Sequence, residues 1–438
     1  TDHVSHWTQS VVLDVASEIN TDALSRAIQA VVAHHDMLRA RYVKQGDQWQ
    51  QRIDAHDNPH VELAIHDVSA RTPEQYAQYV SDLERDLQAQ LDIEAGKLMQ
   101  VACVRYGTST RVIWTIHHLV VDAVSWFILI DDLDTVYRQI LAGEPVSLPA
   151  KTTSFQAWSR YLHQRAETAT WHDTDPTASL PRDETESATS YIADSRSHSA
   201  TLTRERTQQF LSDSHDAYHT HAQDILLAAL GQTLTIWAQV DALRVDVEGH
   251  GRETLTTDFD LSRTVGWFTS LYPVRLSHAP QPAQAITTTK ETLRALPNKG
   301  IDYGLLRYLT DDGLGDVPAQ SAVLFNYLGV IEPTADTTAT FALNAPFTLY
   351  RSPQTERPYA FEIHALIADQ RLHIHWHYSP SIHRPETVQT LLASYVSALE
   401  ALIAHCVTQT SQRYTPSDFA DAMLDQDELD DLLSEFGD

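Results

Sequence analysis

The stretch HHLVVDAVSW, His117–Trp126, joins two strong local patterns. Residues 111–116 are rich in Val and Ile and predict a buried β-strand, whereas 123–141 predicts a helix that ends at Gly143. A strand-to-helix junction holds its side chains rigidly, so an imidazole placed there can act as an acid or a base. By spacing alone, the same residues equally suit two buried histidines followed by Asp122 as a helix cap.

Strand and helix patterns alternate on both sides of this junction. In the first part of the chain, apolar patterns predict strands at 11–15, 61–66, 97–106 and 111–118. Residues 21–38 predict a helix after an Asn20/Thr21 cap, and Thr72-Pro73 opens another towards Leu91. Later strands are expected at 242–250, 271–276, 321–329 and 360–367, with helices at 222–240 and 391–403. The mixture predicts two α+β lobes.

A polar stretch rich in Asp, Ser and Thr indicates where the lobes divide. We expect a first lobe at 1–167, an inter-lobe linker at 168–199 and a second lobe at 200–416. The remaining residues, 417–438, contain nine Asp or Glu and no Lys or Arg, but keep apolar residues at helical spacing. They predict an acidic amphipathic tail, which either packs on the second lobe or docks on another subunit.

Composition narrows the classes of function. The 438 residues include 59 acidic and 31 basic ones, and the net charge of -28 argues against binding to nucleic acid. We find no run of about 18 apolar residues to span a membrane and no signal peptide, so we expect a cytoplasmic protein. Cys103 and Cys406 are expected to be reduced core thiols. The start without Met suggests a segment of a longer polypeptide.

Together with its surroundings, His117–Trp126 resembles the HHxxxD active-site motif of the condensation-domain superfamily. Its Ser125-Trp126 ending is similar to the epimerisation branch of nonribosomal peptide synthetases. Three further strings resemble motifs of that branch: Val247–Glu253 (VEGHGRE), Arg263–Pro273 (RTVGWFTSLYP) and Phe325–Gly329 (FNYLG).

Two weaker strings support the same resemblance. Pro297–Gly304 (PNKGIDYG) departs from the usual pattern by carrying Asp302 where the family commonly has Gly. The family's opening motif is missing, but His6–Ser10 (HWTQS) is similar to the stretch that follows it. Six of the 14 glycines fall within the quoted strings, which indicates close backbone approach or positive φ there, with ordinary turns as the alternative.

The resemblance implies a fold and an activity. The fold would be two chloramphenicol-acetyltransferase-like α+β lobes, arranged as a V-shaped pseudodimer with a central tunnel. The activity would be epimerisation of the α-carbon of an L-aminoacyl or peptidyl thioester, carried on the phosphopantetheine arm of a peptidyl carrier protein. We expect no metal and no cofactor of the domain's own, because 4'-phosphopantetheine arrives with the carrier and no motif Lys is placed to bind pyridoxal phosphate.

Inversion by removal and return of a proton needs a group on each face of the α-carbon, or one group and a substrate that turns. Desolvation at the end of a strand would make Glu248 a well-matched proton carrier near neutral pH, so we expect it to be the main acid/base. The resemblance places His118 across the substrate, as the opposite acid/base or as the donor to the enolate. We expect Asn326 and Tyr327 to orient the thioester or Glu248.

Other residues of the motifs are expected to support this site rather than to react: His117, Asp122, Ser125, Trp126, Gly249, Gly251, Arg252 and Trp267. Asp122 resembles the superfamily aspartate that braces the active loop. Trp126 and Trp267 are expected to exclude water, with core packing as an equal alternative. His373, His375 and His377 would share one strand face, but their parallel directions argue against a zinc site.

The expected partners are an upstream peptidyl carrier domain and a downstream condensation domain or synthetase subunit. Two other functions stay open from the sequence. Condensation uses the same scaffold and HHxxxD motif to form an amide, although VEGHGRE and the Ser-Trp ending argue against it. A non-catalytic carrier-docking module would fit if the Asp302 departure marked decay.

Overall fold

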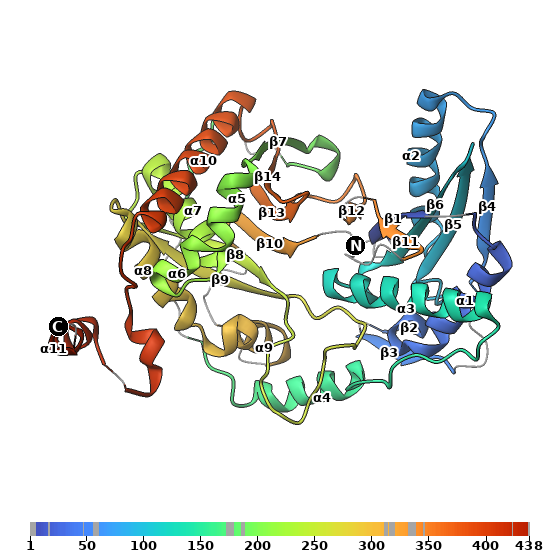
Figure 1. Ribbon diagram of the computed structural model, residues 1–438, viewed down its shortest axis with the longest axis horizontal. Helices are drawn as coiled ribbons and strands as arrows, with labels where there is room; N and C mark the ends of the chain where they lie inside the picture. The colour runs from blue at the N-terminus through green and yellow to red at the C-terminus, as the bar shows by residue number, and fades with distance from the viewer. Residues whose placement is uncertain are drawn as a thin grey trace. The chain divides into compact units, whose positions relative to one another are not determined.

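The computed structural model describes residues 6–15, 18–46, 48–55, 61–171, 179–184, 189–310, 314, 320–331, 339–344, 347–422 and 424–436. The chain divides into two compact units, whose elements are labelled in Figure 1. The first unit comprises Thr1–Leu162, Thr254–Thr269 and Glu332–Thr355. The second comprises His163–Glu253, Ser270–Ile331 and Glu356–Asp438.

The first unit is built on a mixed sheet with the order β11-β1-β6-β5-β4, in which β12 also pairs with β1. Its strands are β1 (Trp7–Val15), β4 (Leu63–Asp67), β5 (Met99–Tyr106), β6 (Ser109–His117), β11 (Phe341–Leu343) and β12 (Thr348–Arg351). A hairpin joins β2 (Ala40–Gln45) to β3 (Gln48–Ile53). The helices are α1 (Thr21–His34), η2 (Asp36–Arg39), α2 (Pro73–Ala89), η3 (His118–Val120), α3 (Ala123–Ala142) and α4 (Phe155–Ala166), which ends in the second unit.

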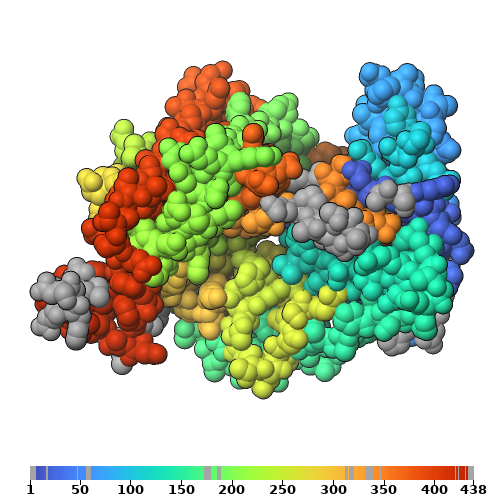
Figure 2. All heavy atoms as spheres, in the orientation of Figure 1, coloured from blue at the N-terminus to red at the C-terminus, as the bar shows by residue number. Residues whose placement is uncertain are grey.

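Side chains of the central strand β6 point alternately to the two faces of this sheet, and different helices pack against each face. Val112, Trp114 and Ile116 of β6 belong to one core cluster with residues of α1 and α3. Ile113 belongs to another cluster with Leu83 and other residues of α2. The outer residues of α2 are exposed on the surface (Figure 2). Helices therefore pack on both faces, and the end of β6 is buried between them.

The second unit is built on a sheet with the order β7-β14-β13-β10-β8-β9, in which β10 runs parallel to both of its neighbours. Its strands are β7 (Arg196–Thr201), β8 (Ala242–Gly249), β9 (Ser270–Ser277), β10 (Val323–Val330), β13 (Phe361–Ala368) and β14 (Arg371–Tyr378). Its helices are η4 (Ile192–Asp194), α5 (Arg204–Leu211), α6 (Asp213–Tyr218), α7 (Ala222–Ala238), α8 (Pro282–Arg294), η5 (Pro297–Gly300), α9 (Ile301–Leu309), α10 (Pro385–Val407), η6 (Pro416–Ala422) and α11 (Gln426–Phe436).

The two faces of this second sheet differ in chemistry. One face packs against α7, α8 and α10 in a single apolar core, to which Val245 and Val247 of β8 and Phe325 of β10 belong. The opposite face carries the alternate residues, which include Asp246 and Glu248 on β8. The period of two that buries the valines therefore turns the acidic side chains away from the core.

Local signals in the sequence agree with the structure. Asn20 caps α1 by accepting a hydrogen bond from the N–H of Ala23, and Thr72 forms a capping box with Gln75 at the start of α2. Gly143 closes α3 with a φ of 71°. The expected α+β fold is confirmed by these two mixed sheets with helices, whereas the V-shaped pseudodimer with a tunnel stays a prediction.

The units differ from the continuous lobes expected at 1–167 and 200–416. Segment 332–355 belongs to the first unit because β11 and β12 pair with β1, and segment 254–269 belongs to it through hydrogen bonds to Asp122 and Ser125. The expected linker at 168–199 already includes the start of β7, which pairs with β14. Residues 172–178 and 185–188 of that linker lie outside the described residues. Strand pairing between distant segments produces this division, and local composition does not indicate it.

One helix is long and apolar enough to cross a membrane by length and composition, although the sequence suggested no such run. This helix is α10, Pro385–Val407. One side of it is buried in the core of the second unit, where Leu391, Tyr395 and Leu399 are at most 3% exposed. We therefore assign α10 as a core helix of the second unit.

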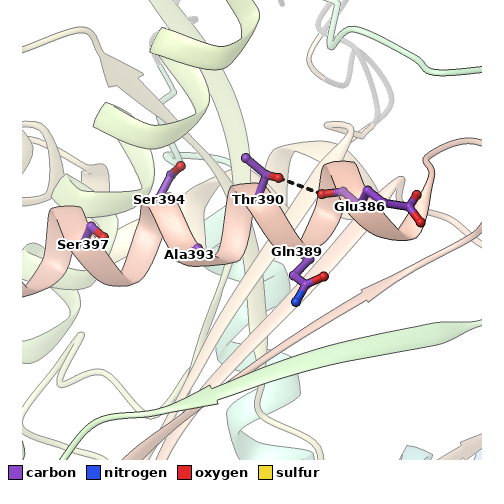
Figure 3. A pocket seen from close by; sticks show the side chains of 6 residues that line it. All are labelled: Glu386, Gln389, Thr390, Ala393, Ser394 and Ser397. Atoms are coloured by element: carbon purple, nitrogen blue, oxygen red, sulfur yellow. Dashed lines mark hydrogen bonds between the residues drawn. The ribbon is translucent and has the colours of Figure 1, made fainter.

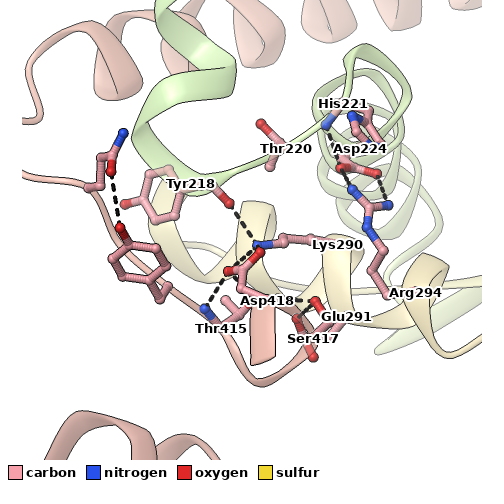
Figure 4. A network of polar contacts seen from close by, with 12 residues as sticks. Tyr218, Thr220, His221, Asp224, Lys290, Glu291, Arg294, Thr415, Ser417 and Asp418 are labelled. Carbon is pink, nitrogen blue, oxygen red and sulfur yellow. Dashed lines mark hydrogen bonds and ion pairs between the residues drawn. The ribbon is translucent and has the colours of Figure 1, made fainter. Parts of the chain in front are cut away.

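A buried ion pair anchors the start of the acidic tail to the second unit (Figure 4). Lys290 of α8 is fully buried, and its Nζ donates hydrogen bonds to both carboxylate oxygens of Asp418, at 2.7 and 2.6 Å. The same Nζ donates to the carbonyl oxygen of Tyr218 at 2.8 Å. Residues around Asp418 thus pack on the second unit, and docking of the tail on another subunit stays a prediction.

Gly300 and Gly304 allow a matched test of the PNKGIDYG string. Gly300 has a φ of 91°, and an added Cβ would lie 2.1 Å from the ring of Tyr272. Gly304 lies within α9 with open space around it. We expect Gly300→Ala to lower the free energy of unfolding by about 2 kcal/mol or more, and Gly304→Ala to leave it unchanged or raise it by about 0.5–1 kcal/mol. Urea denaturation measures both, and equal stabilities would contradict this account.

Candidate active site

His118 follows directly after β6 and is 8% exposed. Its Nδ1 lies 2.9 Å from the carbonyl oxygen of Val121, and its Nε2 lies 3.1 Å from the amide nitrogen of Gln9 on β1. Burial lowers the pKa of His118, and the hydrogen bond to Val121 and the charge of Asp122 offset this only in part. The imidazole is therefore neutral at neutral pH.

Two tryptophans surround the ring of His118. The ring centroids of Trp7 and Trp267 lie 5.0 and 5.1 Å from that of His118, and the two indoles meet edge to face at 4.8 Å. Trp267 thus contacts His118, and its expected role in excluding water stays a prediction. Trp7 was not assigned from the sequence, although it belongs to the HWTQS string.

Asp122 has two partners that come from different parts of the chain. One carboxylate oxygen accepts from the N–H of Ser125 at 2.8 Å and caps α3, and the other accepts from the N–H of Phe268 at 3.1 Å. The hydroxyl of Ser125 donates to the carbonyl of Gly266 at 3.0 Å and accepts from its N–H at 3.1 Å. Together these bonds hold the segment that carries Trp267 against α3.

The other two motif residues of this junction are buried. His117 is fully buried, and its Nδ1 accepts a hydrogen bond from the N–H of Leu119 at 3.2 Å. Trp126 is also fully buried, meets Trp114 edge to face in the core, and donates its Nε1–H to Oε1 of Gln9 at 2.9 Å. Core packing, the alternative considered for Trp126, therefore describes it better than a wall facing the substrate.

A polar cluster between the end of α1 and α3 has the spacing of a metal site. Among the described residues, His34, His35 and Asp132 are the group whose candidate ligand atoms lie within 4.8 Å of one another. The carboxylate of Asp132 is already bonded to Nε2 of His35 at 2.7 Å and to the guanidinium of Arg263. Because Arg263 brings its own positive charge, we interpret the cluster as an ion-pair network that anchors 254–269.

Glu248 lies in the second unit, whereas His118 lies in the first. The side-chain amide of Asn326 on β10 donates a hydrogen bond to Oε2 of Glu248 on the neighbouring strand β8. Both side chains lie on the polar face of the sheet and are partly exposed. The structure thus brings together two of the predicted site residues, because Leu324 and Phe325 of β10 pair in register with Asp246 and Val247 of β8.

Tyr327 departs from its expected role. It follows Asn326 on β10, so its side chain lies on the opposite face of the sheet, where it packs against the apolar core of the second unit. Burial raises the pKa of Tyr327 to about 12. The structure thus places Tyr327 against the core rather than beside Glu248, and its expected role in orienting the thioester stays a prediction.

The residues after Gly249 are irregular backbone that follows the end of β8. A Cβ on Gly249 would lie 2.7 Å from Oγ of Ser270, and Gly251 has a φ of 66°. The N–H of Arg252 donates to Nδ1 of His250 at 3.0 Å. A side chain at either glycine would meet a steric or backbone conflict, and support of the site by these glycines stays a prediction.

Two polar residues, one in each unit, lie near predicted site residues and were not assigned from the sequence. Gln9 contacts His118, and only the likeness of HWTQS to a family string pointed to that stretch. Asp246 lies two residues before Glu248 on the same face and is 3% exposed. It accepts from the N–H of Ser321 at 3.0 Å and from the hydroxyl of Tyr359 at 3.2 Å. The sequence could have indicated Asp246, because residues two positions apart on a strand lie on the same face of the sheet.

Two other features lie outside this site. His373, His375 and His377 share one face of β14, as expected, and among the described residues they form no group with metal-ligand spacing. An open hollow runs along α10, lined by Glu386, Gln389, Thr390, Ala393, Ser394 and Ser397 (Figure 3). None of the predicted site residues lines it, so we assign no catalytic role to this hollow.

Substitutions of Asp122 test its double role. We expect Asp122→Ala to lower the free energy of unfolding by about 2–4 kcal/mol, because two buried N–H groups lose their acceptor. Asp122→Asn keeps one acceptor oxygen and should lose about half as much. Asp131→Ala is the control on the same helix, since that side chain is 61% exposed and should contribute less than about 0.5 kcal/mol. Thermal unfolding measures all three, and equal losses for Ala and Asn at 122 would argue against two-point bracing.

Comparisons with known proteins show the family of the chain. A family model described as Condensation domain matches residues 1–424. One subunit of linear gramicidin synthase from Brevibacillus parabrevis is 38% identical over 447 residues, which are 97% of this chain and 9% of that protein. Surfactin synthase subunit 1 of Bacillus subtilis (strain 168) is 34% identical over 449 residues, which are 98% of this chain and 12% of that protein. The chain therefore spans only a small part of these relatives.

Solved structures show the same fold. The epimerization domain from the third module of tyrocidine synthetase B has a TM-score of 0.83 and 33% identity, with 92% of each chain covered. The first condensation domain of the calcium-dependent antibiotic synthetase has a TM-score of 0.66 and 20% identity, which shows the fold alone, with 92% of this chain and 93% of that one covered. The chain therefore belongs to the condensation-domain family of nonribosomal peptide synthetases.

Proposed function

We propose that this domain is a cofactor-independent epimerase. Its substrate would be an L-aminoacyl or peptidyl thioester on the phosphopantetheine arm of a peptidyl carrier protein. The observation that carries the proposal is the Glu248 carboxylate at the end of β8, oriented by the Asn326 amide. The likeness of Val247–Glu253 to the epimerisation branch and the 33% identity to a solved epimerization domain support it.

The chemistry needs only proton transfer. A base removes the α-hydrogen as a proton, and the C–H electron pair forms a double bond to the carbonyl carbon while the carbonyl oxygen becomes an oxyanion. A proton returned to the opposite face of the α-carbon restores the thioester with inverted configuration. We assign these steps to Glu248 and His118. Because the reaction is reversible, each group acts as base in one direction and as acid in the other.

The surroundings of each group suit this role. Trp7 and Trp267 exclude water from the His118 imidazole, which strengthens its interaction with a developing charge. The Asn326 amide stabilises and orients the negative Glu248 carboxylate. Asn326 is therefore a positioning residue for Glu248.

The partners follow from the same proposal. A thioester substrate requires a carrier domain to deliver it, and the chain matches only 9% and 12% of the two synthase relatives named above. We propose an upstream peptidyl carrier domain in a cytoplasmic assembly, followed by a condensation domain or by another subunit. The acidic helix α11 is a candidate contact for the partner that follows.

Condensation is the second candidate, because the matching family model is named for it and His118 belongs to a motif of the whole superfamily. Its reaction joins two carrier-bound substrates through an amide bond. It has no step that exchanges the α-hydrogen with solvent, so an exchange measurement separates the two functions.

Exchange of the α-hydrogen tests the proposed function. The domain is mixed in deuterated water with a carrier loaded with an L-aminoacyl thioester. We expect α-deuterium and a mixture of L and D forms, measured by mass spectrometry and chiral analysis after cleavage. Glu248→Gln should nearly abolish exchange, and His118→Ala should reduce it by about 10²- to 10⁴-fold, the typical effect of a positioned acid/base.

Glu253→Gln is the matched carboxylate control. Glu253 lies five residues after Glu248, and its carboxylate pairs with His250 and Lys299. It should retain wild-type exchange. Wild-type exchange in both Glu248→Gln and His118→Ala would overturn the site assignment, and amide formation without exchange would support condensation.

The pH dependence of exchange provides a second test. His118 must be neutral to accept a proton, and burial lowers its pKa. Exchange limited by His118 should therefore persist as the pH falls to about 6.5, the ordinary value for histidine, and should be lost only as the pH falls further through the lowered pKa. Rates measured from about pH 5 to 8 check this. Loss of activity with a midpoint above 6.5 would contradict it.

A further inference from the structure

The two nitrogens of the His118 ring face partners of opposite kinds. A backbone carbonyl can only accept, so the contact of Nδ1 with the oxygen of Val121 at 2.9 Å requires a hydrogen on Nδ1. A side-chain amide nitrogen can only donate, so the contact of Nε2 with the nitrogen of Gln9 at 3.1 Å requires a lone pair on Nε2. Both contacts agree on one neutral tautomer.

The orientation of the Gln9 amide is itself determined by a third residue. The indole N–H of Trp126 is a donor only, and it lies 2.9 Å from Oε1 of Gln9. With its oxygen held by Trp126, the amide must turn its NH₂ group towards Nε2 of His118. Gln9 is 8% exposed and Trp126 is fully buried, so bulk water does not compete for these bonds.

We infer that Gln9, oriented by Trp126, is a positioning residue that holds His118 in the Nδ1–H tautomer with Nε2 as a proton acceptor. The catalytic part of the inference rests on the proposed function. The tautomer itself rests on the hydrogen bonds that link Trp126, Gln9, His118 and Val121. In this tautomer the neutral ring cannot donate through Nε2 to an enolate oxygen. Nε2 has a single lone pair, and Gln9 donates to it in this structure. His118 is therefore assigned as an acid/base that accepts the α-proton once the substrate displaces the Gln9 N–H, rather than as the donor to the oxyanion.

The same arrangement has a consequence for the protonated ring. When Nε2 receives a proton, its N–H faces the N–H of Gln9, and two donors then compete without an acceptor between them. The positive charge of Arg351 also opposes the imidazolium. Loss of the hydrogen bond from Gln9 therefore destabilises the imidazolium relative to the neutral ring.

Three substitutions test the chain of contacts. Gln9→Glu replaces the donor by a carboxylate that accepts from both Trp126 and His118, so it should place a proton on Nε2. Gln9→Met keeps the length of the side chain without a donor, and Trp126→Phe frees the Gln9 amide to turn, so both should give a mixture of tautomers. Trp114→Phe is the matched control, because the buried indole N–H of Trp114 has no hydrogen-bond partner among the residues that the structure describes.

The measurement is the ¹⁵N spectrum of histidine-labelled domain without substrate, with the His118 signals identified by their loss in His118→Gln. Wild type and Trp114→Phe should show a protonated Nδ1 and an unprotonated Nε2, and Gln9→Glu should show a protonated Nε2. An Nε2–H tautomer in the wild type would overturn the inference. So would an unchanged Nδ1–H tautomer in Gln9→Glu, Gln9→Met and Trp126→Phe. Thermal unfolding verifies that each variant is folded. If Gln9→Glu does not fold, the test is made with Gln9→Met and Trp126→Phe.

The exchange assay adds the functional readout. Gln9→Glu should shift the acid limb of the pH profile for α-deuterium exchange upwards and reduce exchange at pH 7 by about tenfold or more, since one pH unit corresponds to a factor of ten. An unshifted profile would contradict the positioning role. The tautomer is measured without substrate, so this test of the inference does not depend on epimerase activity. If the proposed function is wrong, the wild type will show no exchange.

Discussion

The carboxylate of Asp122 accepts hydrogen bonds from two backbone N–H groups, and the site in the first unit depends on this pair. One N–H belongs to the first turn of α3, and the other belongs to Phe268, 146 residues later. A carboxylate has two oxygens and can satisfy both donors at once, which a hydroxyl or a single amide oxygen does less well. Through this bracing the segment 254–269 is held on the first unit, and Trp267 reaches the ring of His118.

A different constraint shapes the site in the second unit. Strand alternation that buries Val247 in the core must turn Glu248 to the opposite face of the sheet. A carboxylate that leaves bulk water needs hydrogen-bond donors, and Asn326 supplies one from the adjacent strand. Asp246 obtains its donors from Ser321 and Tyr359 in the same way. The alternation of side chains along β8 and the hydrogen bonds to the carboxylates therefore together determine where the acidic groups lie.

The sequence predicted the elements whose signals are local. The strands at 97–106 and 111–118 and the caps at Asn20 and Thr72 appear in the structure close to the expected residues. Helix α1 ends earlier than expected, at His34, because His35 is extended and a short 3₁₀ turn follows. The division into units was not predictable in this way, because β11 and β12 find their partner β1 more than 300 residues away in the chain.

By itself, the sequence determined which side chains are available and which faces of a strand or helix they share. It identified His118, Asp122, Glu248 and Asn326 from their strings, but it also selected Tyr327, which alternation turns into the core. Only the tertiary structure decided that Gln9 meets His118, that Phe268 meets Asp122 and that Asn326 meets Glu248. The physical reason is that a hydrogen bond forms only when donor and acceptor atoms lie about 3 Å apart and in the right direction. Between distant segments of the chain, strand register and the path of the loops determine both the distance and the direction.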